Sequence, residues 1–510
     1  MSSNQSHPKG LYLLFATEMW ERFSYYGMRA IFILFMTKAL FMTNADASNI
    51  YGSYTGLVYL TPLLGGYISD RYWGNRRSIL VGGILMAIGQ FLMFFSGSTV
   101  TDGVQSASAI SMMWAGLTFL IIGNGFFKPN ISTMVGQIYP KGDHRIDGAF
   151  TIFYMGINLG AFFSPLVCGG LGDTGNIHDF RWGFLAAGTG MLISTITFEL
   201  LKNKYLITPE GEAVGMPRQK MDIKTYGIIG GSVAIIFFLL NFKNMFTVSF
   251  DPIGYLIYAS MIIMPLIIFS DKSLNKEERE RISVIFILAF FVIFFWACFE
   301  QAGASLTLFA DSQTNRFIGS WEMPASWFQS INPLAIVLLA PLFTMFWNAL
   351  NKRNLEPSSP LKMAFGLLLL ALGYIVIAYA VHGVSSTEKI TMWWLWALYI
   401  LHTMGELSLS PIGLSMVSKL APLRFSSLLM GTWFLANAAA NKFAGTLSAL
   451  IPPGAGESPV ETAAVMPSFL GIEINNLFTF FCVFIGLSGT TSLVLFILFP
   501  WLKKRMHGVN

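Results

Sequence analysis

The sequence predicts an all-α polytopic membrane protein with fourteen transmembrane helices, and its composition and its pattern of apolar runs carry this prediction. Of the 510 residues, 54% are hydrophobic and 12% are charged, whereas a soluble domain carries about 25% charged residues. The mean hydropathy is +0.59. Apolar runs long enough to cross a bilayer recur along the whole chain. We therefore expect most of the chain to lie in lipid.

Fourteen apolar spans are expected, in an order of six, two and six. Their expected limits are 11–42, 48–70, 77–97, 109–138, 147–171, 181–202, 225–242, 252–270, 281–310, 326–350, 362–382, 391–419, 425–450 and 472–502. The seventh and eighth spans are short and almost featureless, and a polar linker at 203–224 precedes them. We therefore predict an N-terminal six-helix bundle in 1–202, a cytoplasmic linker and two-helix hairpin in 203–280, and a C-terminal six-helix bundle in 281–510.

The basic residues predict the orientation, because positive charge gathers in cytoplasmic loops. Of the 32 Lys and Arg residues, 23 fall in the loops and ends of one side, and four fall on the other side: Arg181, Lys243, Arg316 and Lys389. This bias places both termini in the cytoplasm. The net charge of +5 is spread over short loops, so we interpret it as a topology signal and expect no nucleic-acid partner.

The first span carries four charged residues in an apolar setting: Glu18, Glu21, Arg22 and Arg29. Each charge at the bilayer centre costs roughly 2.5–3.5 kcal/mol, so these residues must face a partner or a wet cavity. At about 100° per residue, four side chains fall within about 60° of each other: Glu18, Arg22, Tyr25 and Arg29. Glu21 lies about 40° outside this stripe. A structural ion-pair cluster between helices remains the alternative interpretation.

Three further spans carry isolated charges, namely Lys128, Glu300 and Glu406. Each lies near Gly or Pro, in GNGFFKPNIS, FWACFEQAG and GELSLSPIG. Charged residues at such breaks, in both halves of a chain, point to a transporter site at the bilayer midplane. For each residue alone, a buried ion pair is the alternative. Together, basic and acidic groups on opposed walls would suit a zwitterion, and a spare carboxylate would be free to bind a proton.

The segment GGYISDRYWGNRR (65–77) follows the second span. Its two glycines, Gly65 and Gly66, allow close helix approach. Asp70 can cap or pair across the loop, and Arg71 and the later arginines anchor the cytoplasmic face. The segment resembles the loop signature of the major facilitator superfamily. This resemblance implies two six-helix bundles around a central cavity, with the two-helix insertion outside them.

The motif EMWERFSYYG (18–27) resembles the helix 1 signature of the proton-dependent oligopeptide transporter family. Six further segments look like parts of the same family: GNGFFKPNIS (123–132), FYMGINLG (153–160), FWACFEQAG (295–303), FQSINPLAIVLLAP (328–341), GELSLSPIGLS (405–415) and MGTWFLANAAAN (430–441). The resemblance runs in order through both halves, from residue 18 to residue 441. It implies a bacterial-type symporter that imports di- and tripeptides with protons by alternating access.

The resemblance also implies roles for single residues. Proton coupling would involve Glu18, Glu21, Arg22 and Glu300. Arg29 and Lys128 would hold the carboxylate of the peptide, and Glu406 would hold its ammonium group. The other expected substrate contacts are Tyr25, Tyr59, Asn158, Trp296, Asn332, Ser410 and Trp433. For the two tryptophans, core packing is the alternative. Arg29 with Glu300 would close the outer gate, and Lys128 with Glu406 would help close the inner one.

Other classes of protein remain as alternatives. A transporter of the same fold could carry another small charged solute, such as nitrate, a metabolite or a drug-like amine. A membrane-embedded enzyme is disfavoured, because the sequence has no HExxH, no GxSxG, no nucleotide loop and no histidine pair at metal spacing. A channel would need a continuous pore. We expect no metal and no cofactor, a proton gradient as the driving force, and a monomer in the cell (inner) membrane.

Overall fold

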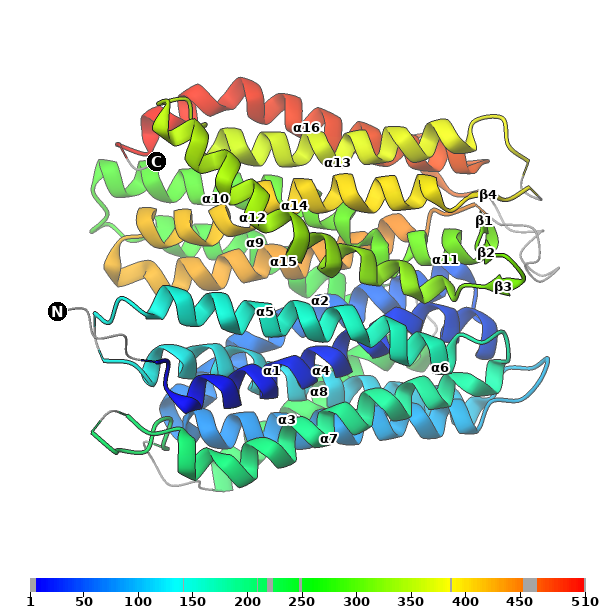
Figure 1. Cartoon of the computed structure of the whole chain (residues 1–510), viewed down its shortest axis with the longest axis horizontal. Helices are drawn as coiled ribbons and strands as arrows, with labels where there is room; N and C mark the ends of the chain where they lie inside the picture. Colours follow the sequence, from blue (N-terminus) through cyan, green and yellow to red (C-terminus); the bar gives the residue numbers. More distant parts are fainter. Residues whose placement is uncertain are drawn as a thin grey trace. The chain divides into compact units, whose positions relative to one another are not determined.

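The computed structural model describes residues 6–140, 142–208, 210–217, 223–246, 250–385, 388–452 and 466–508, and it is helical over most of them (Figure 1). The chain forms two compact units. Unit 1 contains Met1–Phe41 and Leu57–Pro252, and unit 2 contains Met42–Gly56 and Ile253–Asn510. The predicted division at residues 202 and 280 is a different partition of the chain, and it stays a prediction.

Unit 1 is built around α1 (Lys9–Leu34). Its other helices are α3 (Gly74–Ser98), α4 (Ala107–Gln137), α5 (Ile146–Ser164), the single turn α6 (Gly170–Gly172), α7 (Phe180–Tyr205), α8 (Ile223–Phe246) and the second half of α2 (Asn44–Ile68). Single π-helical turns extend α1, α2 and α5 at Phe35–Ala39, Ser69–Trp73 and Pro165–Gly169, and a 3-10 turn at Ile177–Asp179 precedes α7. Helices α5 and α7 both pack on α1, and α3 packs on α4 and α7.

Unit 2 contains the first half of α2 and eight further helices. These are α9 (Pro252–Phe269), α10 (Lys276–Phe299), α11 (Ser305–Ser312), α12 (Ile331–Lys352), α13 (Ser359–Val381), α14 (Trp393–Leu420), α15 (Ser426–Ser448) and α16 (Leu477–Arg505). Within this unit α13 packs on α14 and α16, and α10 packs on α15. Helix α10 begins with a capping box, in which Asn275 and Glu278 each accept a hydrogen bond from the backbone N–H of the other. Such reciprocal bonds fix a helix start.

The loops of unit 2 carry six strands of two residues each. Strand β1 (Thr314–Asn315) pairs in parallel with β4 (Ile390–Thr391). Strand β2 (Phe317–Ile318) pairs antiparallel with β3 (Trp321–Glu322), and β5 (Ser468–Phe469) pairs antiparallel with β6 (Ile472–Glu473). Short 3-10 turns lie at Glu300–Gly303, Ala325–Ser330 and Leu423–Phe425. These pieces shape the ends of the helices and form no sheet core.

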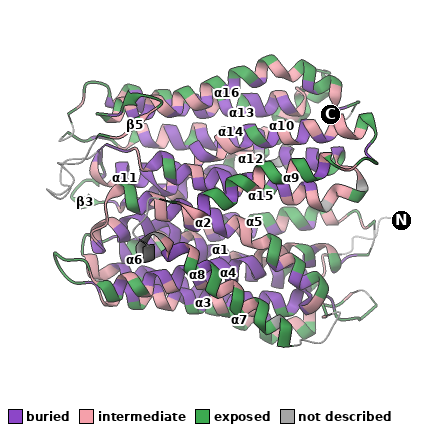
Figure 2. Ribbon diagram, turned by 180° about the vertical axis from the view of Figure 1, so that it is seen from behind, coloured by how far each residue is buried: buried purple, intermediate pink, exposed green. Residues whose placement is uncertain are grey.

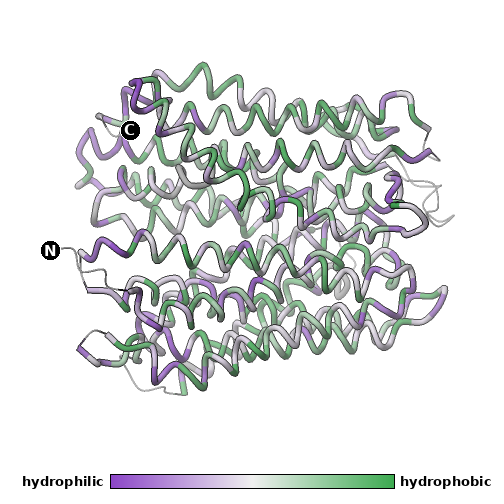
Figure 3. The backbone as a smooth tube through the Cα atoms, in the orientation of Figure 1, coloured by the Kyte–Doolittle hydropathy of each residue, from purple (hydrophilic) through white to green (hydrophobic). Residues whose placement is uncertain are grey.

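Each of the fourteen predicted spans coincides with a long helix, and most limits agree within a few residues. The predicted span 281–310 is wrong at its end, because α10 stops at Phe299 and a 3-10 turn separates it from α11. By length and composition, nine stretches of the described chain are apolar enough to cross a membrane, with α2 and α3 counted as one stretch. Hydrophobic residues follow the helices and hydrophilic ones gather in the loops (Figure 3). Apolar side chains also remain exposed on outward faces of α7, α12 and α16, as at Leu200, Met345 and Ile497 (Figure 2). Lipid explains these faces, since water would not tolerate so many of them.

Helix α2 is divided between the two units. Its first half packs within unit 2, where the Ser48 and Ser448 hydroxyl oxygens lie 2.8 Å apart and Lys442 Nζ donates to Ser53 Oγ at 2.8 Å. Its second half packs within unit 1, where Thr61 donates to the Ile121 carbonyl at 3.0 Å. One continuous helix therefore takes part in both cores.

Close helix approach was predicted for both glycines of the 65–77 loop signature, and it occurs at one of them. A Cβ on Gly65 would lie 1.9 Å from the Gly125 carbonyl oxygen, so α2 and α4 can meet there only through glycine. At Gly66 the prediction is wrong, because a Cβ would meet only Pro129, at an ordinary 3.8 Å.

Arg76, at the end of the same loop, anchors the linker that follows α7. Its Nε donates to the Val214 carbonyl at 2.5 Å and its Nη1 to Asn203 Oδ1 at 2.9 Å. A further bond joins Nη2 to the Leu206 carbonyl. The predicted anchoring arginine thus holds the linker on the start of α3.

Candidate functional site

The charged face of α1 is buried inside unit 1. Glu18, Glu21 and Arg22 are 3%, 0% and 3% exposed. Arg22 Nε lies 2.9 Å from Glu18 Oε1 and 2.6 Å from Glu21 Oε2. The helical spacing predicted that Glu18 and Arg22 share a face, and their contact confirms it. One guanidinium therefore faces two carboxylates, so this cluster carries one negative charge more than positive when all three groups are ionised.

Helix α4 supplies a polar partner that the sequence analysis missed. Asn124 Nδ2 donates to Glu21 Oε1 at 3.2 Å, and Asn124 itself is buried. Asn124 precedes Lys128 by four residues, which puts both side chains on one face of α4. That spacing is the signal that could have identified it. The positive charge of Lys128 also acts on Glu21, so α4 contributes both an amide and a cation to this region.

Aromatic rings lie against the cations of unit 1. Arg22 Cζ lies 5.6 Å from the centroid of the Tyr25 ring, and Lys128 Nζ lies 4.2 Å from that of Tyr59. Arg29 Cζ lies 5.6 Å from the neighbouring ring of Tyr26. A cation over an aromatic face is stabilised by the ring quadrupole, more so when water is absent. Tyr25 and Tyr59 thus lie beside the cations, within the same unit.

On α5, the predicted substrate contact Asn158 is buried. Its side-chain amide donates to the Tyr154 carbonyl one turn earlier, at 3.0 Å. That bond occupies one donor of the amide and leaves the carbonyl oxygen of the side chain for another partner.

In unit 2, Glu406 on α14 is buried beside neutral polar groups. Asn332 Nδ2, at the start of α12, donates to Glu406 Oε2 at 2.8 Å and to Thr403 Oγ1 at 3.0 Å. The sequence analysis named Glu406 and Asn332 and missed Thr403, which lies three residues before Glu406 on the same helix face. This unit therefore holds a carboxylate through an amide rather than through a cation.

Glu300 is buried at the point where α10 ends. It is the first residue of the 3-10 turn Glu300–Gly303, which confirms a break in the helix at the predicted FEQAG segment. Its negative charge acts on Glu406. The two acids of unit 2 are thus close enough to repel each other when both are ionised.

The two predicted tryptophans differ in their surroundings. Trp433 is 4% exposed and packs against Gly413, where a Cβ would lie 2.3 Å from the Trp433 ring. Trp296 is half-buried, with its ring 5.2 Å from that of Phe299, edge to face. Trp433 is thus packed within unit 2, whereas Trp296 keeps an accessible surface, and the pocket-wall role of both tryptophans stays a prediction. The side chain of Ser410 lies outside the described part of the structure.

Two kinds of predicted residue remain, those of the gate pairs and those of the loop signature. The gate pairs Arg29–Glu300 and Lys128–Glu406 each join residues of different units, so their contacts stay predictions. Asp70 is exposed, and Arg71 Nη1 donates to the Tyr67 hydroxyl at 3.0 Å. Within the described residues, no three His, Cys, Asp or Glu side chains gather at metal-binding distance.

The fold and these sites define a class of protein: a polytopic membrane protein that buries carboxylates, amides and cations inside helices long enough to span a bilayer. Comparison with known proteins specifies this class further. The POT family profile matches residues 76–460. The chain belongs to the POT family of transporters, and the predicted major facilitator fold with fourteen helices is confirmed.

Individual relatives agree with this assignment. The chain is 37% identical over 459 residues to the peptide transporter YePEPT of Yersinia enterocolitica subsp. palearctica serotype O:3, with 86% of this chain and 87% of that protein covered. It is 34% identical over 455 residues to a di-/tripeptide transporter of Lactococcus lactis subsp. cremoris, with 84% and 87% covered. A crystal structure of the peptide transporter POT in complex with sulfate superposes with a TM-score of 0.81 at 32% identity, covering 99% of this chain and 97% of that one.

Proposed function

We propose that this protein is a proton-coupled symporter that imports di- and tripeptides by alternating access. The relatives named above are peptide transporters, which supports peptides as the substrate class. The observation that carries the proposal is the buried carboxylate of Glu406, held in unit 2 by the neutral amide of Asn332 at 2.8 Å. A buried carboxylate needs a positive partner or a proton, and the ammonium group of a peptide would supply the first of these.

The opposite end of the peptide would meet the cations of unit 1. Arg29 and Lys128 would hold the terminal carboxylate, because both present a positive charge beside an aromatic ring. The backbone of a peptide would find hydrogen-bond partners in Tyr25, Asn158 and Asn332. Tyr59, Trp296, Ser410 and Trp433 would complete the walls of the pocket.

Protons would act through the carboxylates. Glu18 and Glu21 compete for one guanidinium, that of Arg22, so protonation of either acid would release part of its hold on Arg22. Protonation of Glu300 would weaken an outer gate with Arg29. Binding of a peptide would compete with Lys128 for Glu406 and so affect the inner gate. Coupling would follow, because each gate opens only when its charge pair is neutralised or replaced.

The cellular setting of the proposal follows the charge pattern. The protein would act as a monomer in the inner membrane. Both termini would lie in the cytoplasm, since the loops assigned to that side hold 23 of the 32 basic residues. The proton gradient alone would drive uptake, without a metal or a cofactor and without chemical change to the substrate.

The test is uptake of labelled dialanine into proteoliposomes with and without an inward proton gradient. We expect accumulation only with the gradient. Glu300→Gln is expected to abolish accumulation, whereas Glu277→Gln, at an exposed glutamate paired with Arg281 at 2.7 Å, should behave as the wild type. Full uphill uptake by Glu300→Gln would refute the assignment of Glu300.

Two alternatives have their own outcomes in this assay. A transporter of nitrate, of a metabolite or of a drug-like amine would take up that solute without competition from unlabelled dialanine. A channel would give a flux that does not respond to the proton gradient.

A further inference from the structure

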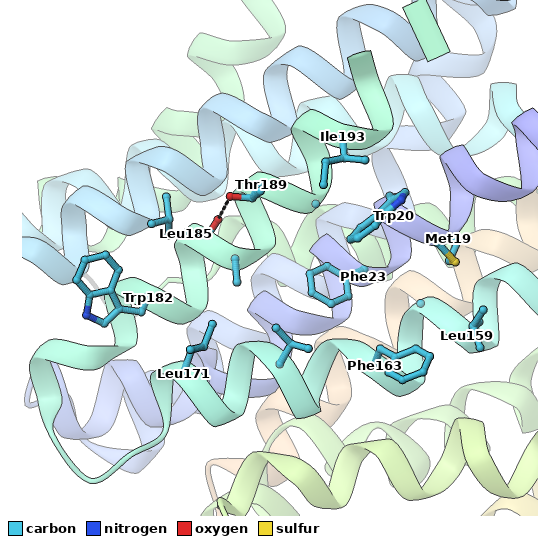
Figure 4. A pocket seen from close by; sticks show the side chains of 14 residues that line it. Met19, Trp20, Phe23, Leu159, Phe163, Leu171, Trp182, Leu185, Thr189 and Ile193 are labelled. Carbon is cyan, nitrogen blue, oxygen red and sulfur yellow. Dashed lines mark hydrogen bonds between the residues drawn. The ribbon is translucent and has the colours of Figure 1, made fainter. Parts of the chain in front are cut away.

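Unit 1 has an apolar groove of about 590 Å³ on a side of α1 that the charged cluster does not occupy (Figure 4). Helices α5 and α7 both pack on α1, and the groove runs between them. Its floor is made by Met19, Trp20 and Phe23 of α1. At about 100° per residue, Trp20 and Phe23 lie about 140–160° around the helix from Glu18. The floor of the groove therefore faces away from Glu18, while its wall meets the charged cluster at Gly160, where a Cβ would lie 3.0 Å from Arg22 Cβ.

Small residues create the depth of this groove. A Cβ on Gly160 of α5 would lie 2.2 Å from the Met19 carbonyl oxygen, and one on Gly190 of α7 would lie 2.7 Å from the Phe23 ring. Both outer helices therefore approach α1 through glycine. A Cβ at Gly160 would displace the α1 backbone, and one at Gly190 would displace the Phe23 ring, so the shape of the groove depends on both glycines.

The lining offers few polar groups to a soluble ligand, namely the indole N–H groups of Trp20 and Trp182 and the hydroxyl of Thr189. Thr189 contributes the one hydroxyl of the lining side chains, and that hydroxyl donates to the Leu185 carbonyl one turn earlier at 2.8 Å. Phe163, Leu171 and Ile193 on the walls are 47%, 48% and 38% exposed. In a membrane protein such side chains face lipid tails. An acyl chain matches this surface, whereas a peptide would lose the hydrogen bonds of its backbone there.

A positive charge lies next to one end of the groove, on Arg181, which does not itself line the groove. Trp182 lines that end and is 42% exposed, and Figure 4 shows it apart from Trp20 and Phe23 on the floor. Arg181 Cζ lies 4.8 Å from the Trp182 ring. The Nε of Arg181 is buried and has no hydrogen-bond partner among the described residues. Trp with Arg at the end of a span is typical of the lipid headgroup level, and a guanidinium binds phosphate through two parallel N–H groups.

We propose that this groove binds one phospholipid of the surrounding bilayer, with an acyl chain along Trp20 and Phe23 and its phosphate on Arg181. The apolar lining selects the chain, and the guanidinium selects a phosphate headgroup over an uncharged lipid. Unfilled space between helices would forfeit dispersion contacts, and a lipid that lies beside the groove fills it without the entropy loss of drawing a ligand from water. This site does not depend on which solute the protein transports.

The test uses the full-length protein in nanodiscs that contain phosphatidylglycerol with a photoactivatable diazirine on its acyl chain. After irradiation, mass spectrometry of peptides locates the label. We expect labelled residues to concentrate on the groove segments of α1, α5 and α7. Labelling by diacylglycerol with the same chain should be about tenfold weaker, because it lacks the charge-assisted bonds to Arg181.

Three variants make the test specific. Ala186→Trp fills the groove from α7 and should lower its labelling at least about fivefold, while Arg181→Gln should make phosphatidylglycerol label no better than diacylglycerol. Leu493→Trp, on the exposed face of α16, is the matched control. It should change neither the labelling of the groove nor the preference for phosphatidylglycerol over diacylglycerol. Labelling spread evenly over lipid-facing helices, or unaffected by Ala186→Trp, would overturn the site. Equal labelling by the two lipids in the wild type would overturn the phosphate contact, and it can be measured even if Ala186→Trp does not fold.

Discussion

The two units surround their buried acidic side chains with different partners. In unit 1, Glu18 and Glu21 share the guanidinium of Arg22, and Asn124 adds a hydrogen bond. In unit 2, the hydrogen-bond partner of Glu406 is the neutral amide of Asn332. Leaving one ion of a buried pair alone is strongly destabilising. The first group is therefore largely compensated by its own unit, whereas the second is suited to a cation that arrives from outside it.

This difference separates two kinds of residue that look alike in the sequence. A charge compensated within its unit contributes to the stability of the fold at all times. A buried charge that is held by a neutral group contributes to binding when a ligand of opposite charge pairs with it. Variants at the two sites should therefore fail in different assays.

The largest effect is expected from Arg22→Gln. Removal of the guanidinium takes the contacting cation away from two adjacent buried carboxylates, although Lys128 still acts on Glu21. We expect a cost of about 3–5 kcal/mol. Thermal unfolding in detergent, followed by size-exclusion fluorescence, should show a marked fall in the melting temperature together with loss of uptake. Arg22→Lys keeps the charge and should recover part of the stability. An unchanged melting temperature for Arg22→Gln would remove the contrast between the units.

Glu406→Gln should spare the fold and impair binding. Glutamine keeps a hydrogen-bond partner for Asn332, so the free energy of unfolding should stay within about 1 kcal/mol of the wild-type value. The melting temperature should therefore change little. Loss of the charge should weaken dialanine binding at least about tenfold. N-acetylated dialanine, which lacks the ammonium group, should bind the variant and the wild type equally. A variant that discriminates the two peptides as the wild type does would contradict the assigned partner of Glu406.

Asn124→Leu probes the amide that α4 adds to the cluster. Loss of one hydrogen bond to a buried carboxylate costs about 1–3 kcal/mol, less than loss of the guanidinium. Glu21 would then keep the charges of Arg22 and Lys128 but lose its amide partner, and we expect the pH profile of proton-driven uptake to shift. Asn130→Leu is a control on the same helix, because Asn130 bonds Asn75 at 3.0 Å and no acid of α1. Equal shifts from both substitutions would mean that Asn124 acts through packing alone.

The smallest effect is expected at an ion pair outside the membrane. Hydrogen bonds from the Arg145 side chain hold the pKa of the Asp143 carboxyl at about 2, below its usual 3.8. A lowered pKa stabilises the fold above pH 3.8, and this contribution disappears as the pH falls through about 2. Asp143 lies in a short loop, and its pair with Arg145 remains partly accessible to water, with side chains 9% and 19% exposed. Asp143→Asn should leave the melting temperature and uptake at neutral pH unchanged within error, and a large loss would show that this loop carries more than its contacts suggest.

The sequence predicted the positions of the helices better than the contacts that their side chains make. Apolar runs place all fourteen spans, and helical spacing puts Arg22 beside Glu18. Spacing alone set Glu21 at the edge of the stripe, yet the long Arg22 side chain reaches it as well. Angular position describes the backbone, and side-chain length decides the contact.

Contacts between helices were harder to predict. Asn124 and Thr403 were missed because an uncharged polar residue in a span does not by itself indicate a partner. Gly65 and Gly66 are neighbours in sequence and both face α4, but only Gly65 lies against the α4 backbone. The division of α2 between two cores has no local signal, since it depends on which distant helices pack against each half.

The distance in sequence between Glu21 and its amide partner has a consequence for how the protein is made. Glu21 and Asn124 are separated by 103 residues. A ribosome adds roughly 5–20 residues per second, so α1 emerges about 5–20 s before the helix that completes its surroundings. During that interval the charged side chains of α1 have no packed protein interior around them, and contact with lipid would be energetically costly. We expect α1 to stay in contact with the insertion machinery until α4 arrives, and its commitment to the bilayer to be a late event in synthesis.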